Sequence, residues 1–150
     1  EIFDEHNELA YIAKGSFFSF LRKSLTLKDA QENEVAQIKQ KLLAIKPTFF
    51  IRANDGVTCR IKKCFFPLFS SKFIISTPGS EVVLTGDFLS HEYRFEANGE
   101  EIAAVSKHWF SFGDTYGVDI KYDEDIWLIL SSIAVIDMIM HDDSGSVGSD

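Results

Sequence analysis

Apolar and polar positions alternate along most of this chain, and polar turns interrupt the alternation at intervals of roughly twenty-four residues. The turns read DEHNE (4–8), DAQENE (29–34), ANDG (53–56) and EANGEE (96–101), rich in residues that tolerate positive φ. The segments that follow read LAYIAKG, VAQIKQK, VTCRIKK and IAAVSKH. This alternation predicts strands with Ile12, Ile38, Ile61 and Val105 on the inward face and Tyr11, Gln37, Arg60 and Ala104 on the other.

A bulky apolar pair recurs beside these strands. The pairs are Phe17-Phe18, Leu42-Leu43, Phe65-Phe66, Phe88-Leu89 and Trp109-Phe110. A repeat of this length is a hairpin that cannot bury its apolar face alone, so hairpins in series predict an antiparallel meander of about ten or more short strands. A sheet that long curls and closes, which removes its edges. Only EIF precedes the first turn, so we expect either a partner strand upstream of Glu1 or a frayed first hairpin.

The segment from Ile126 to Met140 is apolar at 12 of its 15 positions and predicts a helix over about 124–140. Three acids, at positions 123–125, precede it, as suits a helix N-terminus. Fifteen residues rise only about 22 Å, short of the roughly 30 Å hydrocarbon core of a bilayer. Asp137 interrupts the run, and no Lys or Arg flanks it. We therefore predict no transmembrane span, and a helix buried in the lumen of the barrel.

The repeated hairpins, the segments GDFLSHEYRF (86–95) and IAAVSKHWFSFGDTYGVDI (102–120), and the C-terminal apolar helix resemble the LURP-one-related family. That family is part of the tubby C-terminal-like superfamily, which also contains the phospholipid scramblases. The resemblance covers nearly the whole chain and implies a closed barrel of about twelve antiparallel strands around a central hydrophobic helix. It implies little about activity. The chain lacks a cysteine-rich palmitoylation tract and a Pro-rich N-terminal extension, and the acids before its helix do not reproduce the scramblase calcium segment.

Length and composition fit one globular domain over residues 1–141, followed by a polar tail, 142–150, that we expect to be disordered. The chain has 14 Phe residues, which favours β structure. Cys59 and Cys64 are an odd number of residues apart, so they point to opposite faces of a strand and we expect two thiols. Neither a signal peptide nor a glycosylation acceptor is found, which favours a cytoplasmic protein.

The net charge of -8 argues against nucleic acid as a partner, because phosphate binding needs a basic surface. The charge is unevenly distributed. Residues 1–75 carry 12 Lys and Arg against 8 Asp and Glu, whereas residues 76–150 carry 3 against 15. Such asymmetry can mark an interaction surface or simply two differently solvated faces.

Candidates for catalysis and metal binding are weak. Ser90-His91, Ser106 with His108, and His141-Asp142 are the local nucleophile and base candidates, and none lies in a strand–turn–helix elbow. His91, His108, Cys59 and Cys64 lack metal-ligand spacing. The acids Asp119, Asp123, Glu124 and Asp125 lack the order of an EF-hand and are expected to favour the helix N-terminus instead. We predict no catalytic residue, no metal and no cofactor.

Cations on neighbouring hairpins are the strongest candidates for binding. Lys39 and Lys41 share a strand face, as do Arg60 and Lys62, with Arg22, Lys23 and Lys63 nearby in sequence. If the strands pair in order, these cations stack across the sheet and can meet an anion or a lipid headgroup; otherwise they only keep the exterior soluble. The sequence predicts a non-enzymatic binding or scaffold module for an unassigned ligand or protein partner. One alternative is a peripheral protein that binds phospholipids or phosphoinositides or is scramblase-like. The other is an enzyme whose site forms only in the tertiary structure.

Overall fold

The computed structural model describes residues 1–16, 23–65, 71–109 and 115–145, which form one antiparallel sheet and a C-terminal helix. The strands are β1 (Ile2–Phe3), β2 (Leu9–Ser16), β3 (Ser24–Asp29), β4 (Glu34–Gln40), β5 (Thr48–Ala53), β6 (Thr58–Phe65), β7 (Ser71–Thr77), β8 (Ser80–Asp87), β9 (Glu92–Ala97), β10 (Glu100–Ser106) and β11 (Gly117–Ile120). The 3-10 turn η1 (Asp123–Asp125) leads into the helix α1 (Ile126–Gly145). Each strand pairs with the next one in the chain, so the predicted meander is confirmed.

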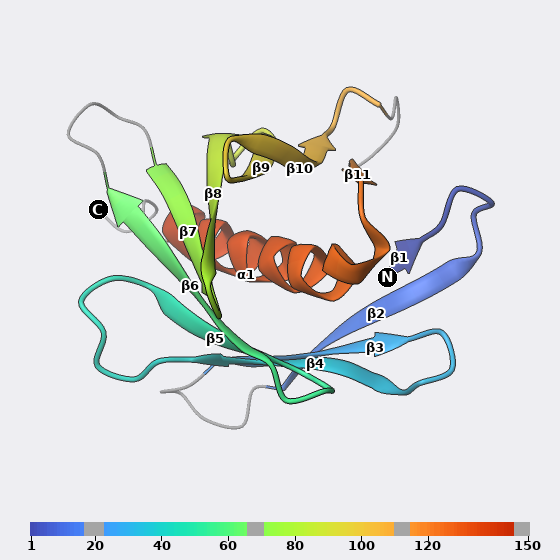
Figure 1. The fold of residues 1–150 in the computed structure, drawn as a ribbon, viewed down its shortest axis with the longest axis horizontal. Coiled ribbons are helices and arrows are strands. Elements are labelled where there is room, and N and C mark those ends of the chain that lie inside the picture. Colours follow the sequence, from blue (N-terminus) through green and yellow to red (C-terminus); the bar gives the residue numbers. More distant parts are fainter. Residues whose placement is uncertain (17–22, 66–70, 110–114, 146–150) are drawn as a thin grey trace.

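The sheet curls around α1, which runs through its concave side (Figure 1). The structure thereby confirms a mainly β fold with antiparallel strands and a central helix. Eleven strands are found in the described ranges, against the predicted number of about twelve. Within these ranges β1 and β11 each have a single strand neighbour. Closure of the sheet into a barrel therefore stays a prediction.

The core forms between the inward face of the sheet and α1. On β5 the side chains of Phe49, Ile51 and Ala53 are buried, and the residues between them are exposed, as period-two alternation requires. On α1 the buried residues surround the helix, and Ile129 and Ile136 are fully inaccessible. A helix that is apolar on nearly every side is stable only when protein or lipid covers it, and here the sheet covers it. Among the described residues, no helix has the length and apolarity needed to cross a membrane.

The helix boundaries differ from the predicted 124–140 at both ends. Residues 123–125 form the 3-10 turn, so α1 begins at Ile126. It continues past Met140 to Gly145, because no glycine or proline interrupts the chain before that residue. The helix thus enters the segment predicted to be a disordered tail, and residues 146–150 lie outside the described ranges.

The inward positions predicted for the strands are confirmed with one exception. Ile38, Ile61 and Val105 are buried in the core. The assignment of Ile12 is wrong, because it lies opposite Lys28 while its neighbour Ala13 lies opposite the buried Leu27. Directly paired residues share a face of the sheet, so the pairing with β3 decides which side of β2 is inward.

Turns alternate between the two ends of the strands, because consecutive strands are antiparallel. The β1–β2 turn, the β3–β4 turn and the start of α1 lie together at one end of the molecule, on the right of Figure 1. The loop between β4 and β5 and the last turns of α1 lie at the opposite end. The first apolar pair, Phe17-Phe18, and the second members of the pairs Phe65-Phe66 and Trp109-Phe110 lie outside the described residues.

Candidate functional site

Three of the four cations predicted to bind an anion lie on the outer face of β4 and β6, and the fourth, Lys41, directly follows β4. Lys39 of β4 is directly opposite Phe50 of β5, which is directly opposite Arg60 of β6. The backbone N–H of Lys41 donates to the carbonyl of Thr48 at 2.8 Å, and Thr48 lies opposite Lys62. The four side chains are exposed. We call Lys39, Lys41, Arg60 and Lys62 the basic patch.

The spacing of the basic patch follows from sheet geometry. Adjacent strands are about 4.8 Å apart, so the backbones of Lys39 and Arg60 are separated by roughly 10 Å. Alternate residues along a strand are about 7 Å apart, which separates Lys39 from Lys41. Phe50 lies between the two cations of the first row and is 39% exposed. Long Lys and Arg side chains around this area can converge on one anion carrying several charges.

The basic patch is not neutralised by acids in the part of the chain that the structure describes, where none of its members forms an ion pair. Some other surface cations are paired, although the exposed Arg52 and Lys121 form no ion pair within the described residues. Lys14 and Lys28 both contact Glu32, with Nζ to carboxylate oxygen distances of 2.8 and 3.1 Å. These two pairs lower the pKa of Glu32. No member of the basic patch is therefore in direct contact with a described carboxylate, on a protein of net charge -8, although the row that contains Arg60 continues through Ser76 of β7 to Glu81 of β8.

Two of the neighbouring cations named in the sequence, Lys23 and Lys63, do not join the basic patch. Lys63 points to the opposite side of β6 from Lys62 and is buried, with its Nζ 4.0 Å from the Sδ of Met140 on α1. Lys23 is half-buried, and its N–H donates to the side chain of Gln40. Arg22 lies outside the described residues.

The predicted nucleophile and base candidates are bound to carboxylates instead. The Ser106 hydroxyl contacts both oxygens of Glu92, at 3.0 and 2.9 Å, and the N–H groups of Lys107 and His108 also donate to Glu92. Burial acts to raise the pKa of Glu92, but these hydrogen bonds outweigh it and lower the pKa. The His108 imidazole is largely exposed, and its Nε2 lies 3.8 Å from a carboxylate oxygen of Glu92. The imidazole is therefore directed at Glu92 and not at the Ser106 hydroxyl. This geometry holds together one end of the β9–β10 pair and does not activate the serine.

The same holds for Ser90, whose hydroxyl donates to Asp87 at 2.6 Å. That bond and the bond from the Ser90 N–H lower the pKa of Asp87. His141 is exposed at the end of α1, and the side chain of Asp142 lies outside the described part.

A polar cluster that the sequence did not predict connects α1 to the sheet. Asp137, the single acid in the apolar run, accepts a hydrogen bond of 2.5 Å from the hydroxyl of Tyr116. The Nε2 of His91 lies 3.3 Å from its other oxygen. The rings of His91 and Tyr116 stack with centroids 4.5 Å apart. The presence of Asp137 inside an apolar helix was the available signal, because a half-buried acid needs partners.

Burial affects the phenols of Tyr93 and Tyr116 and the imidazole of His91 in and around this cluster. Burial, and next the negative charge of Asp137, raise the pKa values of Tyr93 and Tyr116. Both phenols therefore stay protonated. The hydroxyl of Tyr93 and the Nδ1 of His91 are buried and have no partner among the described residues. The sequence placed His91 beside Ser90, whereas the structure places it beside Asp137, with both side chains partly open to solvent.

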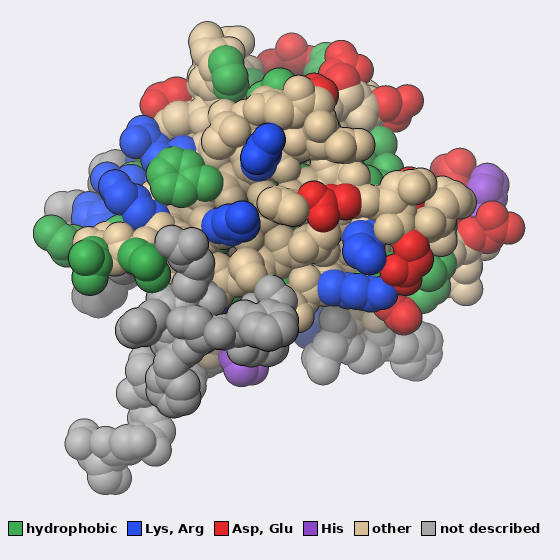
Figure 2. All heavy atoms as spheres, turned by 90° about the horizontal axis from the view of Figure 1, so that it is seen from below, with side chains coloured by type: hydrophobic (Ala, Val, Ile, Leu, Met, Phe, Trp, Pro, Cys, Tyr) green, Lys and Arg blue, Asp and Glu red, His purple; other side chains and the backbone are tan. Residues whose placement is uncertain are grey.

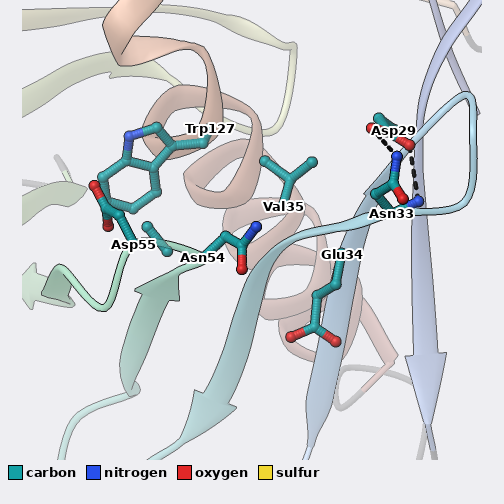
Figure 3. A pocket seen from close by; sticks show the side chains of 8 residues that line it. Asp29, Asn33, Glu34, Val35, Asn54, Asp55 and Trp127 are labelled. Atoms are coloured by element: carbon teal, nitrogen blue, oxygen red, sulfur yellow. Dashed lines mark hydrogen bonds between the residues drawn. The ribbon is translucent and has the colours of Figure 1, made fainter.

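An open pocket of about 690 Å³ lies at the other end of the molecule, beside the start of α1 (Figure 3). Asp29, Glu34 and Asp55 line it together with Trp127 of α1. Asp29 is bound by the side chain and the N–H of Asn33, and these bonds lower its pKa. The described residues that line the pocket include three acids and no histidine. The pocket is separate from both the His91 cluster and the basic patch.

Within the described ranges, no group of three or more His, Cys, Asp or Glu side chains is arranged to hold a metal ion. Of the acids expected at the helix N-terminus, Asp123, Glu124 and Asp125 form η1, whereas Asp119 lies on β11. The side chain of Tyr122, the N-cap residue of η1, makes no capping hydrogen bond. Cys59 is buried in the core and Cys64 is half-buried, and both are free thiols. This agrees with their predicted placement on opposite faces of β6.

Comparison with known proteins gives a family and no activity. The family model described as LURP-one-related matches residues 1–137. A Bacillus subtilis (strain 168) protein named "Uncharacterized protein YxjI" is 32% identical over 144 residues, which cover 95% of this chain and 85% of that protein. No solved structure matches the chain significantly.

Proposed function

This chain belongs to the LURP-one-related family, and we propose that it is a non-enzymatic binding module that recognises a phosphate-bearing anion at the basic patch. The single observation that supports this function is the arrangement of the patch. Two adjacent cross-strand rows bring Lys39, Lys41, Arg60 and Lys62 onto one face, and no described carboxylate pairs with them.

The chemistry of the patch favours phosphate over a single carboxylate. Arg60 can bind two oxygens of one phosphate with its planar guanidinium, while each Lys supplies a mobile point charge. Cations distributed over an area of roughly 10 by 7 Å suit a ligand with more than one negative group. Ser76, which lies directly opposite Arg60 on β7, extends the row with a hydroxyl donor. Both a soluble polyphosphate and a lipid headgroup have this chemistry.

Titration with inositol hexakisphosphate, followed by calorimetry at low and moderate salt, tests the proposal. We expect salt-sensitive binding that weakens by at least about tenfold in the variant Lys39→Gln/Arg60→Gln, because each cation near an anionic surface contributes about 1 kcal/mol. The matched control is Lys14→Gln/Lys28→Gln, which removes the same charge from cations already paired with Glu32. Equal losses in the two variants would mean that only net charge matters, and the assigned site would be wrong.

A further inference from the structure

The loop between β4 and β5, residues 41–47, carries three large apolar side chains that are exposed to solvent. Leu43 and Ile45 have relative exposures of 104% and 102%, and Leu42 is 43% exposed. None of the three belongs to the core or packs against it. A group of exposed large aliphatic side chains on one short loop is unfavourable in water and is typical of a surface that meets a partner.

The structure fixes the base of this loop, so that its tip projects from the sheet. Lys41 and Thr48 are joined by a backbone hydrogen bond, and the Thr48 hydroxyl donates to the carbonyl of Lys46 at 3.0 Å. The carbonyl of Pro47 accepts a hydrogen bond from the N–H of Lys63 at 3.2 Å. Leu43 at the tip adopts a left-handed backbone with φ of 57°. The tip is therefore short and anchored at both ends, and it cannot fold back on the core without breaking these bonds.

Cations surround the apolar tip. Lys41 and Lys46 flank it in sequence, and the basic patch begins directly at its base, with Lys39 on β4 and Lys62 opposite Thr48. Figure 2 shows hydrophobic side chains protruding beside Lys and Arg at one end of the molecule. Aliphatic side chains enclosed by cations match the interface of an anionic bilayer, where acyl chains lie beneath negatively charged headgroups.

Eight of the 23 acids lie at the far end of the molecule. The β1–β2, β3–β4 and β5–β6 turns and the segment before α1 contain Asp4, Glu5, Glu8, Glu32, Asp55, Asp123, Glu124 and Asp125. Helix α1 runs from this end toward the β4–β5 loop, and Lys63 connects the loop to Met140 near the end of the helix. Its 20 residues span about 30 Å, several times the roughly 8 Å Debye length at physiological salt. Salt therefore largely screens these eight acids from the basic end.

We propose that the β4–β5 loop inserts Leu42, Leu43 and Ile45 into the interface of an anionic phospholipid bilayer while the basic patch contacts lipid phosphates. This inference rests on the proposed function and identifies the phosphate-bearing anion as the headgroup of a membrane lipid. A second copy of the chain fits this surface less well, because a symmetric contact would bring two basic patches together.

The experiment measures co-sedimentation of the whole chain with two kinds of vesicle, one of phosphatidylcholine alone and one of equal parts phosphatidylcholine and phosphatidylserine. The apolar variant is Leu43→Ser/Ile45→Ser. Its matched control is Phe3→Ser/Val57→Ser, which removes exposed apolar side chains from β1 and from the β5–β6 turn. Inositol hexakisphosphate binding is measured on each variant as the readout of the basic patch.

We expect the parent and the control to bind the anionic vesicles and not the neutral ones. The apolar variant should bind anionic vesicles at least about tenfold more weakly, because interfacial binding scales with buried apolar area, and should keep its affinity for inositol hexakisphosphate. In the variant Leu43→Trp, the added tryptophan emission should shift to shorter wavelength on anionic vesicles and be quenched by lipids with brominated acyl chains.

The two proposals fail in different ways. If the apolar variant binds vesicles as well as the parent does, or if the emission of the Leu43→Trp variant is unchanged, the loop does not insert, while the basic patch can still bind phosphate. If vesicle binding depends on the loop but no variant or parent binds inositol hexakisphosphate, the phosphate-binding function is wrong and the insertion stands. Binding to neutral and anionic vesicles alike, or concentration-dependent dimers that disappear in the apolar variant, would overturn the anionic bilayer as the partner.

Discussion

The hydrogen bond between Tyr116 and Asp137 gives the clearest test of how α1 is held inside the sheet. In Tyr116→Phe the ring and its stacking on His91 remain, and only the hydroxyl that donates to Asp137 at 2.5 Å is lost. A hydrogen bond to a charged group contributes about 1.5–3 kcal/mol, and the partial exposure of Asp137 places the expected loss near the lower limit, at about 1–2 kcal/mol.

Urea denaturation measures this loss directly. With a slope of about 2 kcal/mol per molar urea, the transition midpoint of Tyr116→Phe should fall by roughly 0.5–1 M with no change in slope. Because burial and Asp137 raise the pKa of Tyr116, the hydroxyl remains a donor and the fall should be the same at neutral pH and at pH about 9.

The matched control is Tyr122→Phe, which removes a hydroxyl that donates to Glu100 at 2.7 Å on the exposed surface. The chemical change is the same and the acceptor is again a carboxylate, but solvent can replace this bond. We expect no measurable change in the midpoint. If the two variants have equal midpoints, the polar cluster around Asp137 does not anchor α1, and apolar packing alone holds the helix inside the sheet.

Three further outcomes follow from the described geometry. Gly86→Ala should lower the free energy of unfolding, measured by urea denaturation, by about 1–3 kcal/mol, because Gly86 has φ of 139° and an added Cβ would lie 2.4 Å from the carbonyl oxygen of Glu92. Gly79 also has positive φ but has open space around it, so Gly79→Ala should lower the free energy of unfolding by less. Ser131→Ala should raise the free energy of unfolding by up to about 1 kcal/mol in urea titrations, since the buried Ser131 hydroxyl has no partner among the described residues, and a loss instead would reveal a hydrogen bond to that hydroxyl. Burial raises the pKa of Cys59 from 9.0 to about 11. Between these pH values the unfolded chain releases the thiol proton and the folded chain keeps it, so the free energy of unfolding falls as pH rises. This fall should be smaller in Cys59→Ala, and an equal fall in the variant and the parent would contradict the raised pKa.

The fold was largely predictable because its signals are local. Alternation along each strand, Asn and Gly in the turns, and an uninterrupted apolar run are properties of neighbouring residues, and they predicted the antiparallel meander and the buried helix. The prediction was wrong for Ile12, whose neighbours Tyr11 and Ala13 are also apolar. Where both faces of a strand carry apolar residues, only pairing with the adjacent strand decides which face is inward.

The candidate site was predictable only in part. Lys39, Lys41, Arg60 and Lys62 were grouped from the sequence because hairpins in series place consecutive strands side by side, and the register of β4, β5 and β6 then aligned them. The contact between Asp137 and His91 joins residues 46 positions apart in the chain, and no local pattern indicates which side chains will meet a helix inside a curled sheet.

The sequence by itself therefore determined the element types, their antiparallel order, the burial of the helix and the family. Tertiary structure decided the inward face of β2, the partners of Asp137 and the distance between the basic patch and the acids of the β1–β2, β3–β4 and β5–β6 turns. The physical reason is the range of the interactions. Propensity and periodicity act over a few residues, whereas register, the packing of α1 and the addition of charges from several turns depend on residues that are distant in the chain and meet only in the folded protein.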